Sequence, residues 1–248
     1  MGCDIHIKCE VKRKDKWELN TDKVFPNPWY KEGSEDKWNK DEFQDIPDDG
    51  RNYDWFAILA DVRNGRGFAG VSTGSGFDVI AEPRGVPEDA TEEWKEEVKS
   101  WDCDMHSQSY LTLEDFDNFD WNQFTMKYGV ISLGQYEKLR GTTNCPNSWS
   151  GASCGGNIIT VSTDIADAIL ANPEIGLKVE EGKGFWRDKI VTIDKNGKPA
   201  SEFDIKVSYE WPVHYSEWFE HKIKNVVEPM RKLKETYGDV RIVFGFDN

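Results

Sequence analysis

Both ends of the chain carry apolar residues at every second position, a pattern that is typical of a half-buried strand. Between Gly2 and Lys12 every odd-numbered residue is apolar and every even-numbered residue is polar. Near the other end, Val240, Ile242, Phe244 and Phe246 repeat at the same spacing. Because successive side chains of a strand point to opposite faces, this period places one face of each strand on a core. We therefore expect both ends of the chain to lie in one sheet.

The sequence between these strands predicts helices and short strands in mixed order. Helical spacing, capping pairs and turn residues predict helices over 53–63 (ended by Gly65), 88–101, from Thr112, from Ser132, over 164–171, and over 216–237 with a kink at Pro229. Short strands are expected over 158–161, 189–194 and 203–211, with a turn at Asn196-Gly197. This order favours an α+β fold over a doubly wound α/β fold. We predict a single α+β domain over 1–248, in which a mixed or antiparallel sheet contains both end strands and helices pack against it. A loop-rich subdomain is inserted over 140–200.

Composition excludes several classes of protein and partner. The 248 residues include 31 Lys+Arg and 46 Asp+Glu, which gives a net charge of −15, and 13% are aromatic, with 11 Trp. Disordered chains are poor in aromatic residues, so this chain is expected to be globular. Duplex nucleic acid is not an expected partner, because coating it needs a cationic face. A membrane is not expected either, because no run approaches the roughly 18 apolar residues of a span.

The five cysteines indicate free thiols in a reducing compartment. They form no Cys-x-x-Cys pair, which argues against zinc-ribbon and thioredoxin-like sites. A disulfide between Cys145 and Cys154, which share one loop, is an open alternative. The N-terminal residues show neither a basic segment nor an apolar one of the signal-peptide type, so we expect a cytoplasmic protein.

Two loops stand out by their composition. Residues 65–78 are rich in glycine, and we expect them to form a mobile loop that closes over a ligand. Residues 141–157 form a 17-residue loop of small side chains, longer than ordinary connections, so it is either functional or mobile. Trp149 lies within this second loop and is a candidate for stacking on a nucleobase.

Two Asp-x-His pairs are the candidate catalytic groups: Asp4 with His6, and Asp104 with His106. On a strand this spacing puts both side chains on one face. Three interpretations are open. The first is a metal centre, since both residue types bind divalent ions. The second is a metal-free site in which His contacts a phosphate and Asp orients the imidazole. The third is that these are ordinary hydrogen-bonded surface groups. The sequence assigns no metal or other cofactor.

Three arginines are candidate ligand-binding residues because rigid local structure flanks each of them. Arg51 precedes a predicted helix, Arg63 ends it, and Arg84 lies between two prolines. A guanidinium that is held rigidly suits bidentate recognition of phosphate or carboxylate. Tyr53 and Ser107 would add an aromatic ring and a hydroxyl. The alternative for each arginine is pairing with one of the many carboxylates of the chain.

These residues belong to a set of motifs that resembles a family of tailed-bacteriophage and prophage proteins without an assigned activity. The resemblance covers residues 1–125 and the final strand, and it leaves 140–200 as an elaboration of this chain. Its motifs are Gly2-Cys3-Asp4-Ile5-His6, Arg51-Asn52-Tyr53, Val62-Arg63-Asn64, Glu82-Pro83-Arg84-Gly85, His106-Ser107 and Phe246-Asp247-Asn248. The resemblance implies a phage accessory product in the host cytoplasm, and by analogy of context one that counters host defence.

The function expected from residues and resemblance together is binding of a small phosphorylated, nucleotide-like ligand. One shared pocket is predicted, with Asp4, His6, Asp104 and His106 as the reactive groups and Arg51, Tyr53, Arg63, Arg84 and Ser107 as ligand contacts. Two alternatives are open. The same pocket is a phosphoesterase, with or without a metal, that cleaves a nucleotide second messenger; or the chain is an acidic decoy that binds a host protein by charge. The sequence does not determine the oligomeric state.

Overall fold

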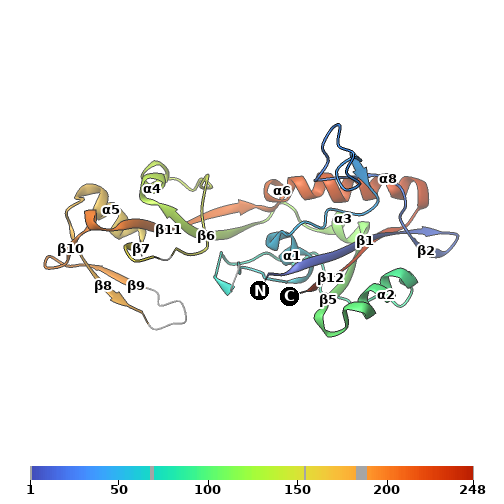
Figure 1. Ribbon diagram of the computed structural model, residues 1–248, viewed down its shortest axis with the longest axis horizontal. Coiled ribbons are helices and arrows are strands. Elements are labelled where there is room, and N and C mark those ends of the chain that lie inside the picture. The colour runs from blue at the N-terminus through green and yellow to red at the C-terminus, as the bar shows by residue number, and fades with distance from the viewer. Residues whose placement is uncertain (1, 68–69, 154, 183–188, 248) are drawn as a thin grey trace. The chain divides into compact units, whose positions relative to one another are not determined.

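The computed structural model describes residues 2–67, 70–153, 155–182 and 189–247, and it shows an α+β fold, as predicted (Figure 1). The chain forms two compact units. The terminal unit comprises Met1–Asn64, Phe77–Gln123 and His214–Asn248, and the inserted unit comprises Gly65–Gly76 and Phe124–Val213. The inserted unit is thus larger than the predicted 140–200. The alternative disulfide involves Cys154, which lies outside the described residues.

The sheet of the terminal unit joins the two ends of the chain, which confirms the expectation drawn from their alternation. Its strand order is β2-β1-β12-β5, with β1 at Asp4–Arg13, β2 at Lys16–Leu19, β5 at His106–Thr112 and β12 at Val240–Asp247. Strands β1 and β12 are antiparallel, and their register runs from the pair Asp4–Asp247 to the pair Val11–Val240. A short pair, β3 (Phe25–Pro26) and β4 (Phe43–Gln44), lies in the segment that follows β2.

Helices cover both faces of this sheet, and Figure 1 shows α2 (Glu92–Trp101) and α8 (Glu228–Tyr237) on opposite sides of it. On one face the ring of Phe246 packs against Phe56 of α1 (Tyr53–Ala60), with 5.1 Å between centroids. On the other face Trp94 of α2 is buried with Met105 and Val243. Because helices lie on both sides, β12 is buried at seven of its eight positions, and the buried residues include Arg241.

Two helix predictions are corrected by the structure. Helix α1 ends at Ala60, because Asp61 adopts a left-handed conformation (φ 59°), so Gly65 does not terminate it. The predicted 216–237 helix is divided into α6 (Tyr215–Trp218), α7 (Glu220–Lys222), a π-helical turn at Ile223–Val227, and α8. Segments α7, the π-helical turn and α8 follow one another without a gap, and Pro229, the second residue of α8, lies just after the π-helical turn. A proline and a π-helical turn are both causes of local helix irregularity.

The described residues of the inserted unit form two three-stranded sheets. One has the order β6-β11-β7, with β6 at Phe124–Ser132, β7 at Ile158–Val161 and β11 at Asp204–His214. The other has the order β10-β8-β9, with β8 at Gly176–Glu181, β9 at Lys189–Ile193 and β10 at Lys198–Pro199. Strands β9 and β11, which flank the Asn196-Gly197 turn, therefore lie in different sheets. Helices α4 (Leu133–Leu139) and α5 (Thr163–Ala171) begin where the sequence predicted.

The glycine-rich segment belongs to the inserted unit and is held by backbone pairing. Arg66 pairs with Ser72 across the segment, and Gly74 pairs with Lys127 of β6. Gly74 has φ +142°, and a Cβ on it would collide with the carbonyl oxygen of Met126. The described part of this segment is therefore fixed at both of these pairs.

The charge of the chain is divided unequally between the two units. The terminal unit holds 35 acidic and 20 basic residues, whereas the inserted unit holds 11 of each. The whole net charge of −15 thus belongs to the terminal unit, and the inserted unit is neutral. Among the described residues no helix is long and apolar enough to cross a membrane.

Candidate functional site

The two candidate histidines lie on opposite faces of the terminal sheet. His6 on β1 pairs with Gly245, and His106 on β5 pairs with the next residue of β12, Phe246. Because paired residues share a face and successive residues alternate, the two imidazoles point away from each other. Ring contacts agree with this: His6 lies against Trp101 of α2, and His106 stacks on Phe246 on the α1 side. The single pocket predicted to contain both histidines is therefore not formed.

Asp4 and His6 share one face of β1, as their spacing predicted, but each is engaged by other residues. Arg51 donates two hydrogen bonds to the carboxylate of Asp4, at 2.8 and 2.7 Å. These hydrogen bonds hold the pKa of Asp4 below its usual value. Arg51 is thus paired with a carboxylate of the chain, which was the alternative to its predicted role in ligand binding.

The imidazole of His6 lies between two carboxylates. Its Nε2 is 3.3 Å from Oδ2 of Asp247, and its Nδ1 is 3.5 Å from Oε1 of Glu97. Glu97 belongs to α2 and also pairs with Lys8, the neighbour of His6 on the same face, at 2.6 Å. These contacts attach α2 to the sheet, which is a structural role for His6.

The second Asp-x-His pair does not share a strand face. Asp104 lies in a 3-10 turn (Asp102–Asp104), and β5 begins only at His106, so the prediction for this pair is wrong. His106 Nδ1 is 3.0 Å from the hydroxyl oxygen of Ser107. Ser107 has φ +51° at a point where the register of β5 against β12 shifts, which is the geometry of a β-bulge. The bulge lets these two consecutive side chains meet.

The other predicted ligand contacts are also held by neighbouring groups. The guanidinium of Arg63 lies 5.6 Å from the ring of Tyr53, and it adjoins the thiol of Cys3. Arg84 forms a bidentate pair with Asp115, at 2.9 and 2.6 Å. In the acidic terminal unit, Arg51 and Arg84 are thus already matched by carboxylates.

A groove of about 680 Å³ lies in the inserted unit, between β6, α4, β11 and the 141–157 loop. Its size falls within the range of small-molecule sites. Its lining combines hydroxyls, amides, two lysines and one aromatic ring. The lining residues are Val130, Ile131, Ser132, Gly134, Gln135, Glu137, Lys138, Asn147, Ser148, Trp149, Ser150, Ser153 and Lys206.

The 141–157 loop forms one wall of this groove and is fixed by polar contacts along its length. The side-chain amide of Gln135 donates to the carbonyl of Ser148, at 2.6 Å, and accepts from the N–H of the same residue. Ser150 exchanges two backbone hydrogen bonds with Val130 of β6. The hydroxyl of Tyr209 donates to the carbonyls of Thr142 and Asn144, at 3.2 Å each. The loop was expected to be either functional or mobile. These hydrogen bonds argue against a mobile loop.

Two lysines line the groove. Lys206 of β11 lines it and pairs with Asp204, at 3.1 Å. Lys138 is exposed on α4, three residues after Gln135, and has no ion pair with a described residue. The buried Lys127 of β6 is not part of the lining, but its ammonium lies 5.3 Å from the ring of Trp149, which is part of it. The lining therefore offers more hydrogen-bond donors than carboxylates.

The sequence indicated this site only in part. It singled out the 141–157 loop and Trp149, but not Gln135, Lys138 or Lys206. Gln135 and Lys138 are three apart on a short helix and so share a face, which is a readable signal. Lys206 reaches the groove only because β11 pairs with β6 and β7. That pairing connects segments far apart in the sequence, so it could not be predicted from local patterns.

The described residues contain no group of three or more His, Cys, Asp and Glu side chains that could hold a metal ion. A scan against protein-family models found no match for the chain, and comparisons with curated proteins and with solved structures found none either.

Proposed function

We propose that the inserted unit binds a small phosphorylated, nucleotide-like ligand in the groove between α4, β11 and the 141–157 loop. One observation carries the proposal: a cavity of about 680 Å³ whose lining is rich in hydroxyl, amide and ammonium donors lies in the neutral unit of an otherwise acidic chain. Phosphate oxygens accept hydrogen bonds and carry negative charge, so a lining of this kind complements them.

The groove suits such a ligand better than the Asp/His/Arg residues of the terminal unit. A phosphate at Arg51 would have to displace the carboxylate of Asp4, and one at Arg84 would have to displace Asp115. In the groove, Lys206 would have to leave Asp204, but Lys138 needs no displacement. The half-buried ring of Trp149 offers a surface for a base.

Binding is supported more directly than cleavage. Glu137 is the one carboxylate, and there is no histidine, among the described residues that line the groove. A general acid and a general base for phosphoester hydrolysis would both be expected there. The phage context implied by the sequence resemblance stays a prediction.

The test is calorimetric titration of the whole chain with cyclic dinucleotides and ADP-ribose. We expect binding by the wild type and at least tenfold weaker binding by a Lys138→Gln/Lys206→Gln variant, because phosphate loses its charged partners. Lys178→Gln/Lys198→Gln is the matched control, since these lysines lie in the same unit and outside the groove lining, and it should bind as the wild type does. His6→Ala should also bind normally.

Either of two results would overturn the proposal. One is the absence of binding to every compound. The other is binding that His6→Ala abolishes and the groove variant leaves intact, which would return the site to the terminal unit.

A further inference from the structure

The segment that joins β2 to α1 in the terminal unit exposes four large aromatic side chains. Trp29 and Trp38 are 65% and 69% exposed, and Tyr30 and Phe43 are 41% and 40% exposed. Tryptophan and tyrosine bury large areas at protein interfaces and are frequent among residues that dominate binding energy. Four such side chains within fifteen residues of one segment therefore need an explanation outside the core.

The backbone that carries these side chains is held by hydrogen bonds. The side chain of Asn27 bonds to the backbone of both tryptophans. The side-chain amide of Asn27 donates to the carbonyl of Trp38, at 2.8 Å, and its oxygen accepts from the N–H of Trp29, at 2.9 Å. At the base of the segment, β3 pairs with β4, and Phe25 is completely buried. A partner would therefore meet aromatic groups on an ordered backbone, which lowers the entropic cost of binding.

Carboxylates outnumber lysines in the segment that carries the aromatic residues. Residues 21–50 include nine carboxylates and four lysines. Some charges of both signs are already engaged: Lys23 pairs with Asp41, at 2.8 Å, and Asp48 pairs with Lys222, at 2.6 Å. The ammonium of Lys37 lies 4.5 Å from the ring of Trp38. The contact between Lys37 and Trp38 also shows that this ring accepts a cation on its face.

We propose that this aromatic loop, residues 27–43, is a docking surface for a basic segment of another protein, in which Lys or Arg alternates with apolar residues. The carboxylates around the loop attract the basic side chains and set the rate and orientation of association. The indoles of Trp29 and Trp38 pack on the apolar side chains and stack with the cations. This surface is independent of the groove in the inserted unit.

The test uses a synthetic 16-residue peptide of alternating lysine and leucine, with a glutamate–leucine peptide as its counterpart. Binding is measured by calorimetry at two salt concentrations. We expect the wild type to bind the lysine peptide, with affinity that falls as salt rises, and not the glutamate peptide. Trp29→Ser/Trp38→Ser should weaken binding at least tenfold without changing the thermal midpoint, because both side chains are exposed.

Two further variants make the result specific. Ile190→Ser/Ile193→Ser removes side chains that are 55% and 50% exposed in the neutral inserted unit, and it should bind as the wild type does. Asn27→Ala keeps both tryptophans but frees the backbone that displays them, so it should weaken binding severalfold. Binding of nucleotides in the groove should be unchanged in all of these variants.

Three outcomes would overturn this inference. The first is equal affinity for the two peptides, and the second is equal loss in the tryptophan and isoleucine variants. The third is preferential binding of a glucose or xylose oligosaccharide that depends on Trp29 and Trp38, which would make the loop a carbohydrate site.

Discussion

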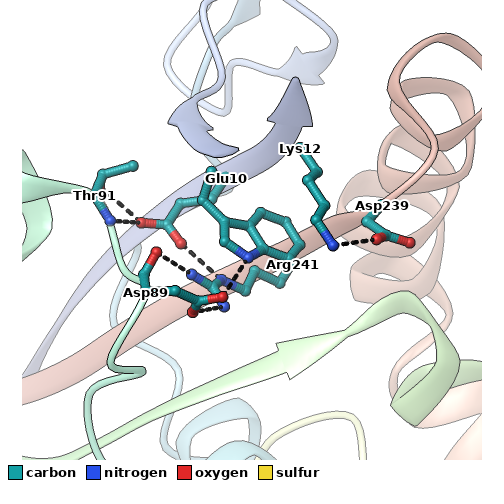
Figure 2. Close-up of polar contacts among 7 residues, drawn as sticks. Glu10, Lys12, Asp89, Thr91, Asp239 and Arg241 are labelled. Carbon is teal, nitrogen blue, oxygen red and sulfur yellow. Dashed lines mark hydrogen bonds and ion pairs between the residues drawn. The ribbon is translucent and has the colours of Figure 1, made fainter. Parts of the chain in front are cut away.

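The carboxylate of Glu10 and the guanidinium of Arg241 form a buried ion pair between directly opposed residues of β1 and β12, with 2.7 Å between Oε2 and Nε (Figure 2). The other oxygen of Glu10 accepts hydrogen bonds from the N–H and the hydroxyl of Thr91, which caps α2. Arg241 also donates to Asp89, and its guanidinium lies 3.9 Å from the ring of Trp17. The Glu10–Arg241 pair and its neighbours thus connect β1, β12 and β2 to the N-terminus of α2.

Removal of one partner of this pair should be strongly destabilising. Glu10→Ala leaves the buried charge of Arg241 without its main partner, and losses of this kind cost about 3–5 kcal/mol. We expect a fall of this size in the free energy of unfolding, measured by urea denaturation. Lys12→Ala is the matched control, because its pair with Asp239 lies next to the first one but is solvent-exposed (Figure 2). It should cost less than about 1 kcal/mol. Equal losses in the two variants would contradict the prediction.

Loss of the Gln135 side chain should release the wall of the groove. In Gln135→Ala the loop loses both hydrogen bonds at Ser148, so we expect faster proteolysis within residues 141–157 and severalfold weaker binding of nucleotides. Limited proteolysis followed by mass spectrometry measures the first effect. Arg140→Ala, at the end of the same helix, is the control and should leave the cleavage pattern unchanged. Protection equal to that of the wild type would show that the remaining contacts are sufficient to hold the loop.

Acid should weaken the terminal unit through Asp115. Burial disfavours the charged carboxylate, but hydrogen bonds from Arg84 and Thr112 outweigh burial and hold the pKa of Asp115 below its ordinary value. A carboxyl whose pKa is lower in the folded state stabilises that state above its unfolded pKa, near 4, and the stabilisation is lost as the pH falls through the folded value. The free energy of unfolding should therefore decline below about pH 4. The decline should be shallower in Asp115→Asn, while Glu114→Gln should follow the wild type.

Two glycine substitutions should change stability in opposite directions. Gly74→Ala places a methyl group against the carbonyl of Met126 at a φ that other residues avoid, and it should cost at least about 1–3 kcal/mol. Gly134→Ala lies in α4 with open space around the new methyl group, and it should add up to about 1 kcal/mol. Thermal unfolding of both variants measures the difference, and a stabilised Gly74→Ala would refute the steric argument.

Local sequence patterns predicted local structure well. The period of two in the first and last strands identified the face that contacts α1, although β12 is buried on its other face as well. The Thr112–Asp115 pair forms the capping box that its spacing indicates. Ser132 caps α4 through the N–H of Gln135, but the side chain of Gln135 turns to Ser148 instead. Ser148 lies thirteen residues from Gln135. The hydrogen bond from Gln135 N–H to Ser132 was therefore predictable, but the partner of the Gln135 side chain was not.

The predictions that failed concern contacts between residues far apart in the sequence. The faces of His6 and His106 depend on which residues of β12 they oppose, and on the bulge at Ser107. The partners of Arg51 and Arg84 are carboxylates 47 and 31 residues away. The division of charge between the units depends on the fold as well, because the chain alternates between them.

The position of β12 between β1 and β5 has a consequence for biosynthesis. Strand β12 is translated after the other strands that the structure describes, and residues 65–213, which contain the inserted unit, are made before it. A nascent chain halted before Val240 therefore has the complete sequence of the groove but exposes the facing edges of β1 and β5. We therefore expect chaperones to bind such an intermediate at the exposed strand edges of the terminal unit.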